Sequence, residues 1–170
     1  ETVKGGFGAR PGKDGINTIC AGISNTMNVP IETLELSFPL RVDYYEIMAD
    51  SGGPGKYRGG CASRRAWTVL GHNSRASVCL ERTKSPPFGI RDGKAGAAAS
   101  IAIRYPDGTV EELNSKGAFD APAGSQVLLE TPGAGGYGPP RDRDPEALAR
   151  DVEDGYVSAD AAKKLYAKDG

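Results

Sequence analysis

Apolar and polar residues alternate over several short stretches of the chain, which is the pattern of half-buried β-strands. The clearest case is 75–81, where Ala76, Val78 and Leu80 alternate with more polar neighbours. Further strands are predicted at 16–23, 40–48, 61–70, 101–103, 110–113 and 126–131. Because these stretches are short and separated by turn-forming residues, the pattern predicts a mainly β protein.

Local signals refine this prediction at three places. Within 40–48 the apolar face changes at Tyr44 and Tyr45, which predicts a β-bulge or a strand buried on both faces. A Pro-Asp-Gly sequence at 106–108 predicts a hairpin turn between the two strands that flank it. Before the strand at 40–48, Asn28 is predicted to cap a short helical turn.

Residues 141–170 change from strand-like to helical patterning. Asp144, followed by proline and glutamate, predicts the start of a helix that Gly155 ends. Ser158 is predicted to begin a second helix, whose late lysines suit the negative end of its dipole. We therefore divide the chain into a β domain, 1–140, and a helical hairpin packed on it. The predicted fold is mainly β, an antiparallel sandwich or open barrel with long glycine-rich loops.

Glycine accounts for 24 of the 170 residues and is concentrated between the predicted strands. The clusters lie at 5–15, 50–60, 92–100 and 130–140. Ordering glycine costs backbone entropy, so such clusters indicate positive φ or close approach of one backbone to another. They have no tandem period, which excludes a collagen-like repeat. We interpret them as long, shaped loops of the kind that bind ligands.

Composition excludes several classes of function. The net charge is −1 with both signs mixed along the chain, which argues against a nucleic-acid or anionic-membrane binder. No apolar run approaches the roughly 20 residues that cross a bilayer, and no leader pattern is present. Cys20, Cys61 and Cys79 with the single His72 do not make a zinc set. We interpret the cysteines as small buried thiols of a cytoplasmic protein and His72 as solvent-facing.

Two positions are candidates for binding. The second glycine cluster carries Asp50, Ser51 and Arg58, and a serine, an arginine and exposed amides together could hold a carboxylate or phosphate. The same residue types also suit a simple turn at Asp50 with Arg58 paired locally. Glu81 and Arg82, after the strand at 75–81, form either a second binding position or an exposed ion pair. Both alternatives remain open, and no catalytic residue is assigned.

The stretch 133–138 matches the pattern G-x-G-x-x-G after a predicted strand. A dinucleotide site also needs a helix whose N-terminus meets the pyrophosphate. Here Pro139 and Pro140 follow, so we interpret the stretch as a glycine-rich corner. The chain also lacks the spacing of a P-loop or a nucleophile elbow. We therefore expect no cofactor and no metal to be held by this chain alone.

Taken together, several stretches resemble the C-terminal part of the hydantoinase B/oxoprolinase family. They are GARPGKDG (8–15), SNTMNVPIETLE (24–35), FPLRVDYYEI (38–47), DSGGPGKYRGG (50–60), ERTKSPPFG (81–89), SKG (115–117), ETPGAGGYG (130–138) and DPEALARDVEDGYVSADAA (144–162). The resemblance covers nearly the whole chain. It departs from the family pattern at Asp92 and Ala134, where glycine is usual, and at Pro139, where Asp is customary.

The resemblance implies a subunit that hydrolyses cyclic amides such as hydantoins, N-methylhydantoin or 5-oxoproline with ATP. It implies a cytoplasmic heteromer containing the rest of the B-type subunit and a hydantoinase A-type, ATP-binding partner. ATP and a divalent metal are implied for the full assembly. One alternative is a subunit of an ATP-dependent ketone carboxylase, and another is a non-catalytic assembly scaffold. Since the chain reads as a C-terminal segment or small subunit, we expect it to be inactive alone.

Overall fold

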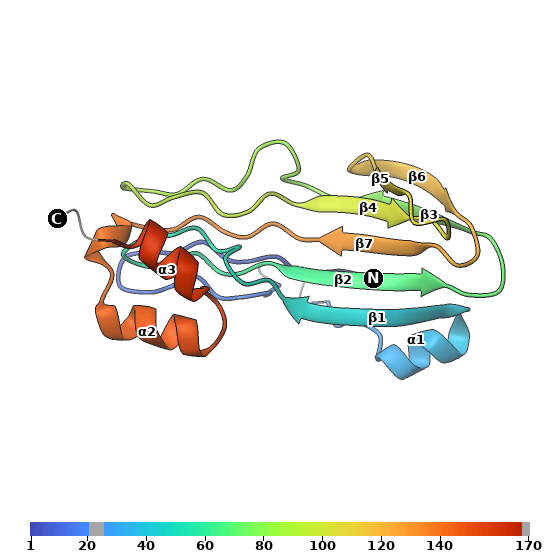
Figure 1. Ribbon diagram of the computed structural model, residues 1–170, viewed down its shortest axis with the longest axis horizontal. Coiled ribbons are helices and arrows are strands. Elements are labelled where there is room, and N and C mark those ends of the chain that lie inside the picture. Colours follow the sequence, from blue (N-terminus) through green and yellow to red (C-terminus); the bar gives the residue numbers. More distant parts are fainter. Residues whose placement is uncertain (21–25, 168–170) are drawn as a thin grey trace.

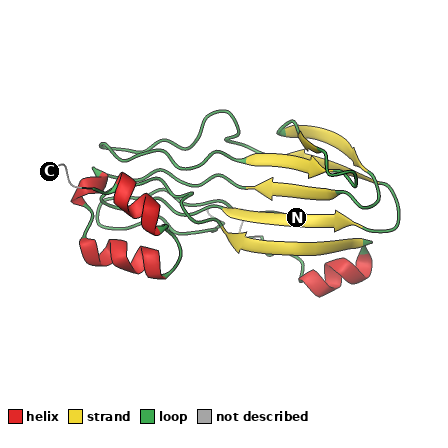
Figure 2. Ribbon diagram, viewed as in Figure 1, coloured by secondary structure: helices red, strands yellow, loops and turns green. Residues whose placement is uncertain are grey.

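The computed structural model describes residues 1–20 and 26–167, which form an elongated molecule with two unlike halves (Figure 1). Strands fill one half, and extended threads without strand structure fill the other (Figure 2). In chain order the elements are α1 (Ile31–Ser37), β1 (Leu40–Ile47), β2 (Ser63–Val69), β3 (Ser74–Cys79), β4 (Ser100–Arg104), β5 (Val110–Glu112), β6 (Lys116–Ala121), β7 (Gln126–Glu130), the 3-10 helix η1 (Pro140–Asp142), α2 (Pro145–Glu153) and α3 (Ala159–Leu165).

Five strands form one antiparallel sheet in the order β1-β2-β7-β4-β5, and β3 pairs with β6 in a second, two-stranded sheet. Within the described residues β1 and β5 remain edge strands, so the large sheet does not close into a barrel. The prediction of a mainly β, antiparallel fold is confirmed, with a sheet that stays open.

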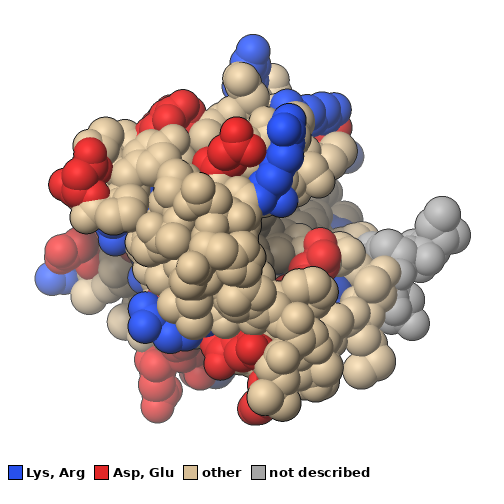
Figure 3. Space-filling model, turned by 90° about the vertical axis from the view of Figure 1, so that its right-hand side faces the viewer, with Lys and Arg blue, Asp and Glu red and all other residues tan. Residues whose placement is uncertain are grey.

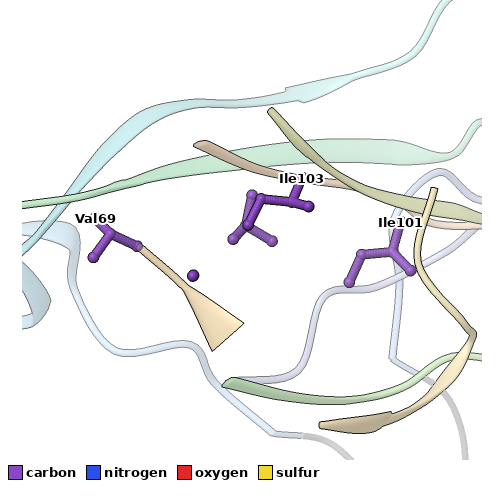
Figure 4. Packing of buried hydrophobic residues seen from close by; sticks show 5 residues of the cluster. Val69, Ile101 and Ile103 are labelled. Carbon is purple, nitrogen blue, oxygen red and sulfur yellow. The ribbon is translucent and has the colours of Figure 1, made fainter. Parts of the chain in front are cut away.

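A small apolar core lies between the two sheets. Val69, Ile101 and Ile103 point to one side of the large sheet (Figure 4), where they meet Ala121 of β6. They share this side because successive side chains of a strand alternate between faces. Ile103 is fully buried, and Val127 of β7 completes the cluster. The alternation seen in the sequence therefore marks the face of each strand that packs.

Two predictions near β1 are refined. The register against β2 shifts between Val42 and Tyr44, so the predicted bulge exists and its extra residue is Asp43. The bulge turns the Asp43 carboxylate toward the Thr68 hydroxyl, which donates to it at 2.6 Å. The short helix α1 also forms, but Pro30 occupies its N-cap and no side chain caps it. The predicted capping role of Asn28 is therefore wrong.

Two strand predictions differ from the structure. The strand expected at 16–23 is absent from 16–20, because backbone groups there bond to the glycine-rich threads instead; for example, Phe7 N–H donates to the Ile16 carbonyl at 2.9 Å. The rest of that prediction, 21–23, lies outside the described residues. Strand β6 was not predicted, because its only apolar side chain larger than alanine is Phe119. Gly117, which pairs with Val78 inside this strand, adds no side chain to the pattern.

The C-terminal helices begin where their caps predict. The Asp144 side chain accepts a hydrogen bond from Glu146 N–H at 3.0 Å, and Ser158 accepts one from Ala161 N–H at 3.1 Å. Gly155 adopts a φ of +75° after α2, as a helix end favours. Helices α2 and α3 lie beside the glycine-rich threads rather than beside the sheets (Figure 1). They therefore extend the half of the molecule that has no strands.

The glycine-rich threads are joined by backbone hydrogen bonds into what we call the glycine bundle, consisting of 5–16, 51–60, 87–97 and 131–139. Its central segment, 131–139, bonds to each of the others. The N–H of Ala134 donates to the Gly60 carbonyl at 2.9 Å, and that of Gly136 donates to the Lys94 carbonyl at 3.0 Å. The threads are thus an ordered structure, although they contain no ladder of strands.

Glycine is required in this bundle because the threads touch through their main chains. A Cβ atom at Gly133 would meet the carbonyl oxygen of Ser51, and one at Gly59 would meet that of Ala134. Both contacts would fall below 3.0 Å, a separation that Cβ atoms do not tolerate. Neither glycine has a positive φ. Close approach of one backbone to another, rather than a positive φ, therefore explains why glycine is required at these two positions.

The surface at the strand end of the molecule is largely neutral. Acidic and basic side chains are interspersed on it rather than gathered by sign (Figure 3). This agrees with the mixed charges of the sequence and its net charge of −1. Among the described helices, none has the length and apolar character needed to cross a membrane.

Candidate functional site

Three of the five candidate residues, Asp50, Ser51 and Arg58, lie where the glycine bundle meets the C-terminal helices. The Asp50 carboxylate accepts a hydrogen bond from the backbone N–H of Ser158, the residue that caps α3, at 2.7 Å. Its own N–H donates to the Tyr156 carbonyl at 3.0 Å. Asp50 has a φ of 60° and thus turns the chain at this point. Its observed contacts fasten the glycine bundle to the helical hairpin.

Ser51 is buried beneath this junction. Its hydroxyl donates to the Met48 carbonyl at 2.6 Å and accepts a hydrogen bond from Ala62 N–H at 2.8 Å. The side chain is only 2% exposed. With both partners supplied by the main chain, the hydroxyl closes the loop between β1 and β2.

Arg58 belongs to a group of charges, the buried Arg58, Arg143 and Asp151 and the partly exposed Asp14, that we name the junction cluster. The Arg58 Nε atom lies 3.2 Å from one carboxylate oxygen of Asp151, and Arg143 Nη2 lies 2.6 Å from the other. Arg143 also donates both Nη groups to the Asp14 carboxylate at 2.8 Å each. The backbone N–H of Arg58 completes the group by donating to Asp14 at 2.6 Å.

The partners of Arg58 correct one interpretation of the loop. Local pairing of Arg58 is wrong, because its carboxylate partner Asp151 lies 93 residues further along the chain. Its Nη1 donates to the Gly59 carbonyl at 2.6 Å and to the Asn17 side chain at 3.2 Å. A local turn would leave this side chain solvated, whereas here it is 4% exposed and needs a buried counter-charge.

Burial and ion pairing act in opposite directions on the pKa values of the cluster. Burial raises the pKa of Asp14, but the hydrogen bond and charge of Arg143 outweigh it, so the net pKa lies below 3.8. Burial lowers the pKa of Arg143, and the Asp14 and Asp151 carboxylates outweigh that effect and raise it. Burial also raises the pKa of the adjacent Tyr166 to about 12. These three groups therefore exchange no proton near neutral pH.

The other two candidates follow β3. The Glu81 carboxylate lies 2.6 Å from Nζ of Lys116 in β6, and both side chains are exposed. Lys116 lowers the pKa of Glu81. Arg82 has a φ of 63°, and its carbonyl accepts a hydrogen bond from Ala99 N–H at 3.1 Å. The structure thus connects Asp50, Ser51 and Arg58 to the junction but shows no contact of that group with Glu81 or Arg82.

A cavity of about 590 Å³ lies between the two sheets. Its wall includes Trp67, Leu129 and Phe119, together with Glu1 at its margin. His72, in an exposed turn as predicted, also borders it. A mostly apolar cavity of this size falls within the range of small-ligand pockets. None of the five candidate residues lines it.

The described residues do not fit the metal that the family resemblance implies. Residues 1–20 and 26–167 contain no group of three or more His, Cys, Asp and Glu side chains that could hold an ion. The glycine stretch 133–138 does not fit a nucleotide either. Its amides bond to neighbouring threads, as in the hydrogen bonds from Gly133 to Ala97 and from Gly138 to Ile90, both 3.0 Å. Donors engaged in this way cannot cradle a pyrophosphate.

The cysteines differ among themselves. Cys61 is buried as predicted, and burial raises the pKa of its thiol. Cys20 is half-buried, and Cys79, at the outer face of β3, is exposed. The expectation of three buried thiols is therefore correct for Cys61 alone, because alternation places Cys79 on the opposite face from Val78.

Sequence reasoning missed three members of the junction cluster. Asp151 lies in the first C-terminal helix beside Leu148 and Val152, so an acid within an apolar face was the one available signal. Asp14 and Arg143 sit in irregular segments and are 129 residues apart in the chain. No periodic pattern could join them.

Comparison with known proteins decides the family. The sequence profile of hydantoinase B/oxoprolinase matches residues 1–140. The chain belongs to this family. It is 37% identical to a protein of Pseudomonas sp. (strain NS671) provisionally named as the B-type subunit of a D-/L-hydantoinase, over 98% of this chain and 28% of that protein. It is 31% identical to the beta subunit of the caprolactamase of Pseudomonas jessenii, over 97% of this chain and 29% of that protein.

Solved structures share the fold. The crystal structure of the ATP-dependent caprolactamase from Pseudomonas jessenii matches 99% of this chain with a TM-score of 0.83 and 29% identity. An acetone carboxylase structure matches 96% with a TM-score of 0.80, and at 24% identity this shows the fold alone. The chain covers 30% and 26% of those two chains, so it corresponds to less than a third of each.

Proposed function

We propose that this chain forms part of the B-type subunit of an ATP-dependent cyclic-amide hydrolase that acts with an A-type, ATP-binding partner. The similarity to the ATP-dependent caprolactamase, which extends over 99% of the chain, carries the proposal. The names of two relatives support a multi-subunit enzyme, since one is the B-type subunit of a hydantoinase and the other is the beta subunit of a caprolactamase. The assembly is proposed to work in the cytoplasm.

Within that assembly the chain supplies structure. The buried charges of the junction cluster neutralise one another, and the glycine bundle uses its amides to hold its own threads together. ATP and the divalent metal are therefore handled by the remaining polypeptide of the B-type subunit and by the A-type partner. Among the five candidates, the exposed residues Asp50, Glu81 and Arg82 are the ones available to meet those neighbours.

Reconstitution of complete B-type and A-type subunits tests this proposal. Hydantoin, 5-oxoproline and caprolactam would be offered, and ADP and ring-opened product measured together. We expect ring opening of one substrate to require ATP and to produce ADP in proportion, with the isolated 170-residue chain inactive in the same assay. Ring opening without ATP consumption, or by the isolated chain, would contradict the proposal.

A ketone carboxylase subunit is the second candidate, because acetone carboxylase shares the fold and the fold alone does not separate the two reactions. The same reconstituted assembly would be supplied with acetone and bicarbonate. ATP turnover that depends on both, without opening of any cyclic amide, would select this function over hydrolysis.

The third candidate, a purely structural scaffold, is tested at Glu81. Its exposed pair with Lys116 has a match in Glu46 and Arg64, since both pairs are exposed with a separation of 2.6 Å. A scaffold role predicts that Glu81→Gln and Glu46→Gln leave turnover and assembly equal. If Glu81→Gln alone lowers kcat in an intact assembly, the loop after β3 takes part in the reaction.

A further inference from the structure

Arg65 of β2 is a buried cation that belongs neither to the junction cluster nor to the candidate loops. It is 1% exposed, the same as Ala121 in the core. Its guanidinium carbon lies 5.0 Å from the ring centroid of Tyr45 and 5.2 Å from that of Trp67. Two aromatic rings stabilise a guanidinium through its charge, but they accept few of its five N–H donors.

The donors of Arg65 are poorly satisfied. All three guanidinium nitrogens are buried, and within 1–20 and 26–167 none has a well-directed hydrogen-bond acceptor. One anion is in contact, the Glu1 carboxylate, which forms an ion pair with Nη1. Arg58, by contrast, donates from Nε and Nη1 to defined acceptors. A buried arginine with so few partners is rare, because each unmet donor costs free energy.

The surroundings of Arg65 overlap the wall of the cavity between the sheets. Glu1 and Trp67 both contact Arg65, and both also line the cavity of about 590 Å³. Elsewhere the wall is mixed, with the apolar Ile101 and Leu129 as well as His72, Arg75 and several small polar residues. The cavity therefore combines a predominantly apolar lining with a buried cation that contacts two of its lining residues. This combination suits a ligand that has an apolar body and an anionic head group.

The Glu1 carboxylate is paired with the cation at one nitrogen, Nη1. The segment that carries it is anchored at Lys4, whose carbonyl accepts hydrogen bonds from the hydroxyls of Ser63 at 2.8 Å and Thr131 at 3.1 Å. A carboxylate in place of that of Glu1 would meet Nη1 and a second unmet guanidinium donor at once, the bidentate geometry that arginine favours.

We propose that the cavity between the sheets binds an amphiphilic monocarboxylate, whose head group replaces the Glu1 carboxylate on Arg65 and whose apolar body lies between the sheets. This binding site is separate from the proposed amide-hydrolysing function and requires neither ATP nor a partner subunit. The ligand class follows from one buried cation, the single acid paired with it and a mostly apolar cavity lining.

Calorimetric titration of the 170-residue chain with octanoate, and with octanol as the uncharged control, tests the site. Arg65→Met is expected to weaken octanoate binding about tenfold or more, because a charge-assisted hydrogen bond is lost. Arg64→Met is the matched control, since Arg64 is its neighbour on the exposed face of β2 and pairs with Glu46. It should bind octanoate as the unchanged chain does, and octanol should not distinguish the variants.

Two further variants keep the test decisive if Arg65→Met fails to fold. Glu1→Gln removes the competing carboxylate and should strengthen octanoate binding several-fold, without affecting octanol. Val78→Trp fills the cavity from β3 and should weaken both probes. Equal octanoate affinity with and without Arg65, unchanged affinity in Glu1→Gln, or no octanoate binding by either the unchanged chain or Glu1→Gln would overturn the proposal.

Discussion

The sheets and the glycine bundle use side chains in opposite ways. In the sheets, buried residues such as Ile103 and Val127 fill the space between layers, so stability comes from apolar surface removed from water. In the bundle, the missing side chains of Gly59 and Gly133 let one main chain lie directly on another. A glycine-rich sequence can therefore specify an ordered structure as strictly as an apolar one, because the absence of side chains lets the main chains pack directly against one another.

The two regions also place their charges differently. The pair of Arg64 and Glu46 beside the sheet is about half exposed on both sides, whereas Arg58, Arg143 and Asp151 at the end of the glycine bundle are nearly inaccessible. Without an apolar core of its own, the bundle is fastened to the C-terminal helices by these buried charges. This difference predicts which substitutions each half tolerates.

Asp151→Ala should have the largest effect, because it removes the carboxylate that pairs with the buried Arg58 and leaves Arg143 with Asp14 alone. We expect a loss of about 4 kcal/mol in the free energy of unfolding, measured by urea denaturation. The control Glu46→Ala breaks an exposed pair and should cost less than about 1 kcal/mol. Similar losses for both variants would show that the junction cluster does not fasten the bundle.

Gly133→Ala should follow, since its Cβ would collide with the Ser51 carbonyl. Relief of that clash requires two threads to separate, which we expect to cost about 3 kcal/mol. Gly8→Ala is the matched control, because nothing lies within 4 Å of a Cβ there, and it should change the free energy of unfolding by no more than about 0.5 kcal/mol. If thermal unfolding shows both variants to be equally stable, the threads are not packed through their main chains.

Ile103→Val removes one methylene from the core between the sheets and should cost about 1 kcal/mol. The same change at Ile90, which is 50% exposed in the glycine bundle, should be nearly neutral. Chemical denaturation of the two variants thus compares how much an apolar side chain contributes to the free energy of unfolding in each half of the molecule. A larger loss of stability at Ile90 than at Ile103 would contradict the proposed difference between the two halves.

The smallest effect is expected in acid. Since the folded pKa of Asp14 lies below 3.8, its carboxylate stabilises the native state above that pH, and the stabilisation is lost as the pH falls through the folded pKa. Asp14→Asn should therefore lower stability at neutral pH and show a smaller further loss below pH 3.8. Parallel stability curves for both proteins across the acid range would exclude this role for Asp14.

Local signals predicted most of the sheet. Strands β2, β3, β4, β5 and β7 were found from alternation and turn residues, and the caps Asp144 and Ser158 located the C-terminal helices. Strand β6 was missed because its apolar pattern depends on Phe119. The strand predicted at 16–23 fails over its described part, 16–20, because the glycine bundle takes up its backbone groups. Such competition depends on residues distant in the chain.

The candidate site was less predictable for the same reason. The sequence drew attention to Arg58, but its ion-pair partner lies 93 residues away and the other members of the junction cluster were not recognised. Arg65 gave no signal beyond being a charged residue in a strand of alternating pattern, because its burial depends on Tyr45, Trp67 and Glu1. Side-chain chemistry that is assembled across the fold leaves little trace in local sequence.

Amide hydrogen exchange tests the account of the glycine bundle most directly. The N–H groups of Gly53, Ala134 and Gly136 donate to backbone carbonyls of neighbouring threads at 2.7, 2.9 and 3.0 Å respectively. We predict that these amides exchange as slowly as those of the paired strands β2 and β7, although they belong to no strand. Exchange at the rate of an unstructured peptide would contradict the claim that this half of the molecule is held together by its main chain.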